Sequence, residues 1–419
     1  MTGEYCWRGP LKIGVILGEA PALIEPGRTT VSSLLKSRGY ATACIGKWHL
    51  GQNWTWKEGA PEDKPKTDQI DYTKRVTGGA NDLGFDYSFV YVCALDFPPY
   101  CFLENGKSVG LPTESIEEES KRLPPRYREQ QPGLAVPGWK NSEMGPTITR
   151  RAVSWIEKQH RENPDQPFFL YLPTSSAHVP YAPPDFIKGK SQAGWRGDMC
   201  AEVDWTVGEV MKTLDRLKLT EETLVIFTSD NGAIIGDRKE GTDDIGPEEI
   251  YETYGHRANG PFQGQKWTVF EGGFRVPFVA RWPGQIAQKT LSSEIICLTD
   301  FLATLAAILG EELPPGAGRD SVDFLPALLG ETGKEPPREA VVLHSQMAMF
   351  AIRSGQWKLI EGHGRGTWYS NTRPAHPGEP PGRLYNVVED PGETTNVWND
   401  HPDIVRRMLA LLDAVRQSD

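Results

Sequence analysis

Segments with helical spacing of apolar residues alternate along this chain with short, nearly continuous apolar runs. In three places a segment with helical spacing is followed by such an apolar run: residues 28–38 by 40–45, 147–160 by 168–172, and 199–219 by 223–228. A run without polar alternation indicates a strand that is buried on both faces. Helices that alternate with such strands predict an α/β fold with a mainly parallel central sheet and helices on both faces.

The C-terminal part of the chain has a different pattern. Short β-prone runs follow one another from about residue 335, and an amphipathic helix closes the chain. The runs cover residues 340–344, 349–353 and 357–360, and the helix covers residues 402–416. This succession predicts a smaller α+β domain with an antiparallel sheet. We therefore expect a large α/β domain at residues 1–334 and a C-terminal domain at residues 335–419.

Two polar, Pro-rich stretches interrupt the first part of the chain at residues 54–74 and 107–146. They are longer than ordinary connections between the elements of a compact domain. We expect them to wall a substrate cleft.

The charge balance limits the classes of partner. The 419 residues include 45 Lys and Arg and 56 Asp and Glu, which gives a formal net charge of −11. This argues against nucleic acid or an anionic membrane as the main partner, so an anionic substrate requires a local cluster of cations. No apolar run reaches the roughly 18 residues of a membrane helix, and residues 1–8 lack the pattern of a secretory signal. We expect no transmembrane segment, and the oligomeric state stays open.

The six cysteines are scattered without a Cys-x-x-Cys pair. This spacing argues against a zinc ribbon and against a thioredoxin-like site. Cys93 and Cys101 could form one local disulfide, and the alternative, which we favour, is that both are buried free thiols.

Polar side chains able to do chemistry follow each of the three strands predicted in the first part of the chain. They are Lys47 and His49 after the first run, His178 after the second, and Asp230 with Asn231 after the third. Residues at the carboxyl ends of parallel strands meet at one edge of a sheet, where α/β proteins bind ligands. Carboxylate and amide oxygens suit a hard cation such as calcium, whereas Lys and His bind an oxyanion and transfer protons.

A fourth candidate, Lys266, precedes a Gly-Gly turn at residues 272–273 and a further β-prone run. His256 and Arg257 lie just upstream of it and could contact a substrate. Each candidate also has a structural alternative: a solvated loop, an Asx turn for the acidic pair, or a histidine that is hydrogen-bonded within its loop. Because four strand ends carry such residues, one shared site with a metal, two ammonium groups and two imidazoles is the simpler explanation.

These motifs make the chain resemble the type I, formylglycine-dependent sulfatases, and arylsulfatase-like members of the alkaline-phosphatase superfamily fit best. The segments that carry the resemblance are Gly39 to His49, Thr228 to Gly232, Lys266 with Glu271 to Gly273, Ala280 to Gly284, and Leu384 to Glu393. The resemblance runs from residue 2 to the end. It implies an alkaline-phosphatase-like α/β domain, a small C-terminal antiparallel sheet, and hydrolysis of sulfuric esters of aryl compounds or carbohydrates.

The resemblance also implies a role for each candidate residue. Asp230 and Asn231 would ligate calcium, or magnesium in its place. Lys47 and Lys266 would bind sulfate oxygens, His49 would assist the nucleophile and sulfate release, and His178 would act at the leaving ester oxygen. The residues expected to contribute to substrate specificity are Asp96, His256 and Arg257. The expected partner is therefore a small-molecule or glycan sulfate ester.

The sequence departs from this family at its amino end. Relatives carry a Cys-x-Pro-Ser-Arg segment whose Cys is oxidised to formylglycine, the nucleophile, and paired aspartates on the first strand. Neither occurs here, and Cys6 stands in Cys6-Trp-Arg-Gly-Pro10 instead. Thr2 to Tyr5 resembles a segment that follows the nucleophile in relatives, so we expect a truncated chain that is inactive as given. A signal peptide would then lie upstream, and a periplasmic or secreted protein would be expected.

A second departure is Ala94, which stands where relatives often have a Ser near the sulfate. Loss of one hydrogen bond would weaken binding by about 0.5–1.5 kcal/mol. Two other functions stay open. One is a non-catalytic sulfate-ester or glycan-binding protein with Lys47, His178 and Lys266 as an anion pocket. The other is a phosphatase or phosphodiesterase, although such enzymes usually assemble two metals and the Asp-Asn-Gly motif fits one calcium better.

Overall fold

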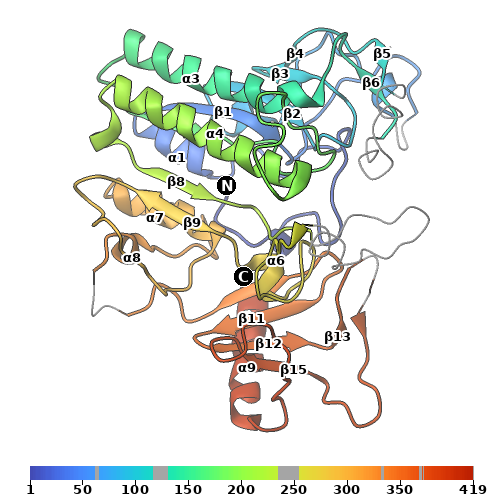
Figure 1. Cartoon of the computed structure of the whole chain (residues 1–419), viewed down its shortest axis with the longest axis vertical. Coiled ribbons are helices and arrows are strands. Elements are labelled where there is room, and N and C mark those ends of the chain that lie inside the picture. Colours follow the sequence, from blue (N-terminus) through green and yellow to red (C-terminus); the bar gives the residue numbers. More distant parts are fainter. Residues whose placement is uncertain are drawn as a thin grey trace. The chain divides into compact units, whose positions relative to one another are not determined.

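The computed structural model describes residues 1–61, 66–116, 131–234, 254–331, 335–367, 370 and 372–418. The chain folds into two units (Figure 1). Unit 1 comprises Met1–Glu4, Ile16–Thr223 and Leu305–Arg319, and unit 2 comprises Tyr5–Val15, Leu224–Thr304 and Asp320–Asp419. Residues 62–65 and 117–130, which belong to the two Pro-rich stretches, lie outside the described residues, and the cleft walls expected from these stretches stay a prediction.

Unit 1 is built on a five-stranded sheet in the order β4-β3-β2-β1-β7. The strands are β1 (Ala41–Trp48), β2 (Tyr87–Val92), β3 (Phe102–Glu104), β4 (Lys107–Ser108) and β7 (Phe168–Tyr171). β1 pairs in parallel with both β2 and β7, whereas β3 and β4 extend the sheet in antiparallel pairing. The carboxyl ends of β1, β2 and β7 therefore lie at the same edge of the sheet.

The central strand β1 is buried on both faces, as its apolar sequence predicts. Ala43 and Ile45 belong to the core cluster that includes residues of helix α3, whereas Cys44 and Trp48, on the alternate face, belong to a second cluster. All four side chains are at most 2% exposed. Complete burial of a side chain such as Ile45 stabilises the fold by about 1.5–3 kcal/mol.

The helices of unit 1 confirm the three predicted helical segments. They are α1 (Val31–Ser37), α3 (Met144–Glu162) and α4 (Gly194–Arg216), and α3 and α4 run side by side (Figure 1). α1 is shorter than predicted because Thr30 has extended backbone and acts as the N-cap. The Thr30 hydroxyl accepts a hydrogen bond from the Ser33 N–H at 3.0 Å, and the Ser33 hydroxyl accepts one from the Thr30 N–H at 2.9 Å.

Unit 2 contains a correction to the expected strand pairing. The apolar run at residues 223–228 forms β8 (Val225–Thr228), but β8 pairs in antiparallel fashion with β9 (Phe278–Arg281) and not with the five-stranded sheet. The mixed α/β fold class is confirmed, whereas the expectation that this strand continues the same parallel sheet was wrong. An apolar run identifies a strand, but its pairing depends on which distant run supplies complementary backbone groups.

The C-terminal part of unit 2 confirms the predicted antiparallel sheet. Its order is β10-β11-β12-β15, and helix α9 contacts β11 and β12. The elements are β10 (Val341–His344), β11 (Phe350–Ser354), β12 (Trp357–Glu361), β15 (Gly382–Asn386) and α9 (Pro402–Gln417). Leu359, Leu384 and Met408 are fully buried where the sheet and α9 meet in one core.

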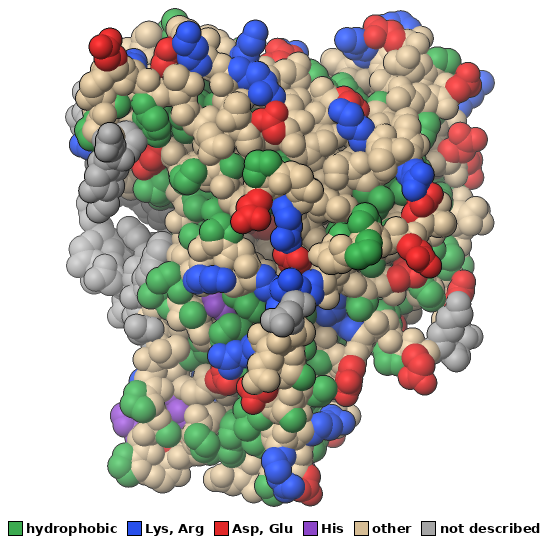
Figure 2. Space-filling view, turned by 180° about the vertical axis from the view of Figure 1, so that it is seen from behind, with side chains coloured by type: hydrophobic (Ala, Val, Ile, Leu, Met, Phe, Trp, Pro, Cys, Tyr) green, Lys and Arg blue, Asp and Glu red, His purple; other side chains and the backbone are tan. Residues whose placement is uncertain are grey.

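The remaining regular elements are short. They are α6 (Glu271–Phe274), α7 (Phe301–Ile308), α8 (Leu325–Leu328), and the strand pairs β5 (Glu114–Ser115) with β6 (Leu134–Ala135) and β13 (His363–Gly364) with β14 (Thr372–Arg373). No helix among the described residues has the length and apolar character needed to cross a membrane. Lys and Arg side chains lie among Asp and Glu side chains on the face shown in Figure 2.

Candidate active site

The predicted site residues fall in both units. Unit 1 contains Lys47, His49, Asp96 and His178, and unit 2 contains Asp230, Asn231, His256, Arg257 and Lys266. In unit 1 the residues follow three parallel-paired strands: Lys47 and His49 belong to the end of β1, Asp96 follows β2, and His178 follows β7. The expected meeting of the β1 and β7 ends at one sheet edge is therefore observed.

Lys47 lies within β1 rather than after it. The parallel pairing with β2 continues through Lys47 opposite Tyr91 and Trp48 opposite Val92, so the strand ends later than its apolar run. The side chain of Lys47 is half-buried, and His49 is the first residue beyond the strand. The ammonium and the imidazole thus leave the same strand end.

Gly46 lets the end of β1 approach the loop that leads to His178. Its φ is +129°, and a Cβ built on it would lie 2.0 Å from the carbonyl oxygen of Pro173. The N–H of Lys47 donates to that same oxygen at 2.8 Å. Only glycine combines this backbone angle with this close approach, so Gly46 and Pro173 fix the backbone of Lys47 against the β7 loop.

His49 is oriented by its Nε2 atom. This nitrogen donates to the carbonyl oxygen of Ile16 at 2.9 Å and lies 3.2 Å from Sγ of Cys93. Because a carbonyl only accepts, Nε2 carries the hydrogen and Nδ1 is the nitrogen that exchanges a proton.

Cys93 is a neutral thiol in this position. Burial is the main reason that its pKa rises to about 12, with Asp96 acting in the same direction and Lys47 against it. Cys93 is 2% exposed and has a φ of +64°, which turns the chain just after β2. All six cysteines are free, so the favoured prediction of buried thiols at Cys93 and Cys101 is confirmed.

His178 and Asp96 form a second pair at this edge. Nδ1 of His178 donates to the carbonyl oxygen of Val179 at 2.8 Å, and it lies 3.8 Å from Oδ1 of the buried Asp96. Because this carbonyl only accepts, Nδ1 of His178 carries the hydrogen in this contact. The structure places Asp96 beside a histidine, where it can modulate proton transfer.

Glu202 is a functional candidate that the sequence did not reveal. It lies on α4, is 3% exposed, and accepts a hydrogen bond from the hydroxyl of Ser176, two residues before His178. Burial raises its pKa to about 7, against the opposing effect of that hydrogen bond. Gly145 on α3 leaves room for it, since a Cβ there would lie 2.1 Å from Oε1 of Glu202. No sequence pattern could have found this contact, because it joins a helix to a distant loop.

In unit 2, Asp230 and Asn231 follow β8 directly. Oδ1 of the exposed Asp230 accepts a hydrogen bond from the N–H of Asn231 at 3.0 Å. The side-chain amide of Asn231 donates through Nδ2 to the carbonyl oxygen of Gly232 at 3.0 Å. This bond directs the amide nitrogen to the chain and leaves the amide oxygen as the group that can accept a further partner.

Asp230 and Asn231 fit a hard cation in part. A carboxylate oxygen and an amide oxygen are the donors that calcium or magnesium takes. Calcium takes about six to eight oxygens, and among the described residues no group of three or more His, Cys, Asp or Glu could hold a metal. The two side chains could therefore supply only part of a coordination shell.

Lys266 is tied to the same turn in unit 2. Its N–H donates to the carbonyl oxygen of Ala233 at 3.4 Å, and its Nζ lies 6.0 Å from the ring centre of Trp267. The side chain of Asn259 bridges both backbone groups of Ala233 at 2.9 Å. The segment that carries Lys266 is thus held close to Asn231, whereas His256 and Arg257 are exposed on the preceding loop.

Known proteins resemble this chain over most of its length. A family model described as Sulfatase matches residues 13–311. The N-acetylgalactosamine-6-O-sulfatase of Bacteroides thetaiotaomicron is 35% identical over an aligned length of 448 residues, gaps included. The alignment covers 99% of this chain and 82% of that protein. Human arylsulfatase A is 30% identical over 417 residues, which cover 95% of this chain and 72% of that protein.

The solved structures agree with the sequence comparisons. A structure from work on the metabolism of multiple glycosaminoglycans by Bacteroides thetaiotaomicron has a TM-score of 0.84 and 32% identity. It covers 100% of this chain and 88% of its own. A structure in complex with D-glucosamine-2-N,6-O-disulfate, at 16% identity and a TM-score of 0.61, shares the fold. On the family model and on relatives matched over nearly its whole length, this chain belongs to the sulfatase family.

Proposed function

We propose that this chain carries the binding site of a carbohydrate sulfatase and that, in the 419 residues present, it binds a sulfate ester without hydrolysing it. The substrate class is supported by the 35% identity, over 99% of the chain, to a protein named as an N-acetylgalactosamine-6-O-sulfatase. This observation carries the proposal. A 6-O-sulfated amino sugar is therefore the first ligand to test.

Each candidate residue has a role that suits its chemistry. Lys47 and Lys266 bind the charged sulfate oxygens, since ammonium groups stabilise an anion in a partly buried position. His178, whose Nδ1 lies 3.8 Å from Oδ1 of Asp96, contacts the ester oxygen of the bound ligand in this proposal. His49 is oriented by the hydrogen bond of its Nε2 to the carbonyl oxygen of Ile16, and its imidazole contacts the bound ester in this proposal.

The proposed cation ligands are Asp230 and Asn231. When bound, calcium or magnesium would supply positive charge against the oxygens of the ester. The exposed His256 and Arg257 contact the sugar in this proposal. The proposal also keeps the domain boundaries expected from the sequence, with a catalytic-type domain at residues 1–334 and a C-terminal domain at residues 335–419.

No residue in this chain fits the family's formylglycine nucleophile. None of the six cysteines begins a Cys-x-Pro-Ser-Arg segment. Cys93 does not replace it, since a thiol with a pKa of about 12 stays protonated at neutral pH. We therefore derive no bond-breaking step for these residues.

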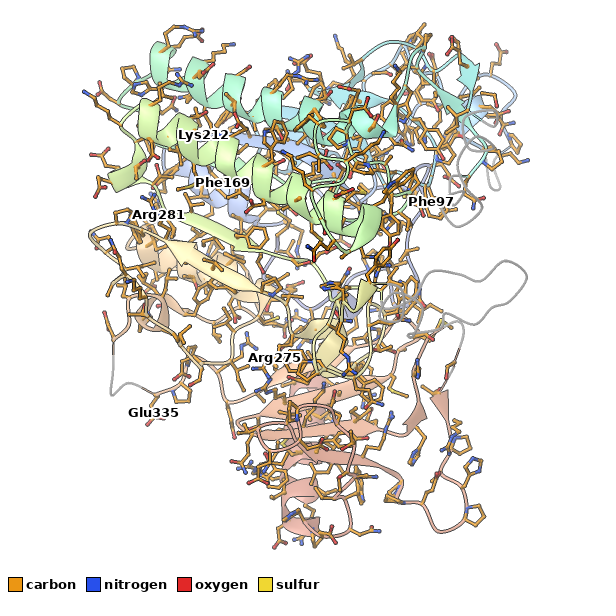
Figure 3. All side chains as sticks on the ribbon, in the orientation of Figure 1. Phe97, Phe169, Lys212, Arg275, Arg281 and Glu335 are labelled. Atoms are coloured by element: carbon orange, nitrogen blue, oxygen red, sulfur yellow. The ribbon has the colours of Figure 1, made fainter. Side chains whose placement is uncertain are left out.

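Turnover of 4-nitrophenyl sulfate tests this part of the proposal. We expect no release of 4-nitrophenolate by the purified chain above a buffer blank. Turnover that survives removal of contaminating sulfatases and disappears in Lys47→Ala, but not in the surface control Lys212→Ala, would contradict it. Lys212 lies on α4 and pairs with Glu209 on the same helix (Figure 3).

A second candidate function is a non-catalytic glycan-binding protein in which Lys47, His178 and Lys266 form an anion pocket. In this second function, binding of the glycan is the protein's activity, whereas in a sulfatase binding precedes hydrolysis. Calorimetry with sulfated oligosaccharides at low and high salt tests it, because saturable heat that persists at high salt and is lost in Lys266→Ala indicates a specific pocket. The phosphatase alternative has no such support, since the matched relatives are named as sulfatases.

A further inference from the structure

Three charged side chains, Lys358, Glu271 and Glu393, are buried together in unit 2, and the partly exposed Arg353 joins them. Nζ of Lys358, on β12, lies 3.1 Å from Oε1 of Glu271 and 3.0 Å from Oε1 of Glu393. Nη1 of Arg353, on β11, donates to Oε2 of Glu271 at 2.9 Å. The side chain of Lys358 has no exposed surface, and among the described residues its charge is paired with these two carboxylates.

The cluster is joined to backbone as well as to side chains. Oε2 of Glu393 accepts a hydrogen bond from the N–H of Glu271 at 2.6 Å. Glu271 is the first residue of α6, and the preceding Phe270 provides no side-chain cap. Glu393 therefore satisfies a buried N–H that the short helix leaves unpaired. Lys358 holds the other oxygen of Glu393 and thereby fixes the direction of that carboxylate.

The next residues of α6 pack against the turn that carries the proposed cation ligands. The N–H of Gly232 donates to the carbonyl oxygen of Gly273 at 2.9 Å. A Cβ on Gly232 would lie 1.8 Å from the carbonyl oxygen of Gly272, so the two backbone segments are in direct contact. The N–H of Gly272 is itself held by the carbonyl oxygen of Gln263 at 2.7 Å. Displacement of α6 therefore displaces Gly232 and, with it, Asn231.

We infer that Lys358 and Glu393 are positioning residues that fix α6 and thereby hold Asp230 and Asn231 in a geometry suited to a cation. The inference rests on the cation role proposed for Asp230 and Asn231. In this inference the C-terminal sheet, through Lys358 on β12, helps to position the proposed cation ligands, and Glu393 does so by accepting the hydrogen bond of the Glu271 N–H.

The test compares Lys358→Met with Arg373→Met in the full chain. Arg373 forms an ion pair with Glu379 at 2.7 Å in the same unit, and both side chains are partly exposed. Amide hydrogen exchange reports on the backbone, and calorimetric titration with calcium chloride reports on the ligands. Arg275, which is labelled in Figure 3, is the residue directly after α6 and locates this helix in the view.

In Lys358→Met we expect the amides of Gly232, Glu271 and Gly272 to exchange at least about tenfold faster, while β9 and α9 keep their wild-type rates. The calcium dissociation constant should rise about tenfold or more, as it does when a supporting residue of a metal site is removed. Arg373→Met should match the wild type in both measurements.

Unchanged exchange at Gly232, or equal acceleration throughout unit 2, would overturn the inference. If the wild type takes up no calcium, the proposed cation role fails, whereas the exchange result still decides whether Lys358 and Glu393 hold the turn. If Lys358→Met does not fold, the double variant Lys358→Met/Glu393→Met removes both charges with apolar side chains, a replacement that buried ion pairs commonly tolerate. The same local acceleration is expected in it.

Discussion

Sγ of Cys93 lies 3.2 Å from Nε2 of His49, at the edge of the unit 1 sheet where β1 and β2 end. This contact places a thiol beside an imidazole, as in enzymes with a cysteine nucleophile. The similarity ends with the protonation state. The imidazole offers its protonated nitrogen to the thiol and to Ile16, and burial keeps the pKa of Cys93 at about 12.

The reactivity of Cys93 follows from this protonation state. Since only the thiolate is alkylated, Cys93 should react with iodoacetamide at pH 7.5 at least about 100-fold more slowly than the exposed Cys200. Mass spectrometry of the corresponding peptides over time measures both rates in one sample. Alkylation of Cys93 as fast as that of Cys200 in the folded chain would show that it is a reactive thiolate.

The approach of Gly46 to Pro173 predicts a large loss of stability in Gly46→Ala. The new methyl group would collide with the carbonyl oxygen of Pro173 at 2.0 Å, so the free energy of unfolding should fall by at least about 3 kcal/mol. The control is Gly39→Ala, which has a φ of +81° but no atom within 4 Å of the new Cβ. It should cost only about 1 kcal/mol of backbone strain. Chemical denaturation measures both, and equal losses would refute the steric explanation.

Glu202 predicts a specific pH dependence of stability. Its folded pKa of about 7 lies above the ordinary value of 4.5, so the folded state retains a proton that the unfolded state releases. Stability is therefore lost as the pH rises from about 4.5 to about 7, by about 3 kcal/mol at most. Glu202→Gln keeps the shape without the charge and should remove this loss.

Denaturation of the wild type and Glu202→Gln at pH 5 and pH 8 measures that difference. The two proteins should be close in stability at pH 5, and the variant should be the more stable one at pH 8. Parallel pH profiles would show that Glu202 ionises freely in the folded chain.

Calcium should stabilise the chain through Asp230 and Asn231. A ligand present at about 100 times its dissociation constant adds about 2.7 kcal/mol to the free energy of unfolding. Asp230→Ala/Asn231→Ala should lose this stabilisation, whereas Asp403→Ala, an exposed carboxylate on α9, should keep it. Thermal unfolding with calcium or with a chelator measures the effect. An identical calcium shift in the double variant would exclude these two ligands.

The sequence predicted the elements of the fold well where the apolar pattern is strong. The runs at 40–45 and 168–172 became β1 and β7, because strands buried on both faces need continuous apolar residues. It did not predict that β8 pairs with β9, since an apolar run contains no information about its partner strand. It also ended β1 too early, at residue 45, because backbone pairing with β2 continues through Lys47 to Trp48.

The candidate site shows the same division. Lys47, His49 and His178 could be identified because they follow the apolar runs of predicted strands, and motif resemblance suggested their roles. Contacts that depend on tertiary packing, such as Glu202 with Ser176 or Glu393 with the backbone of Glu271, join residues far apart in the sequence. No local pattern marks them, so only the folded chain reveals them.

Calorimetric titration with 6-O-sulfated N-acetylgalactosamine tests the central claim, a pocket for a carbohydrate sulfate ester, most directly. We expect saturable binding to the wild type, no detectable binding of unsulfated N-acetylgalactosamine, and loss of binding in Lys47→Ala with Lys212→Ala unchanged. Loss of one buried ammonium contact to the anion should weaken binding at least about tenfold, or about 1.4 kcal/mol. No saturable binding to the wild type, or equal binding by Lys47→Ala, would contradict the account.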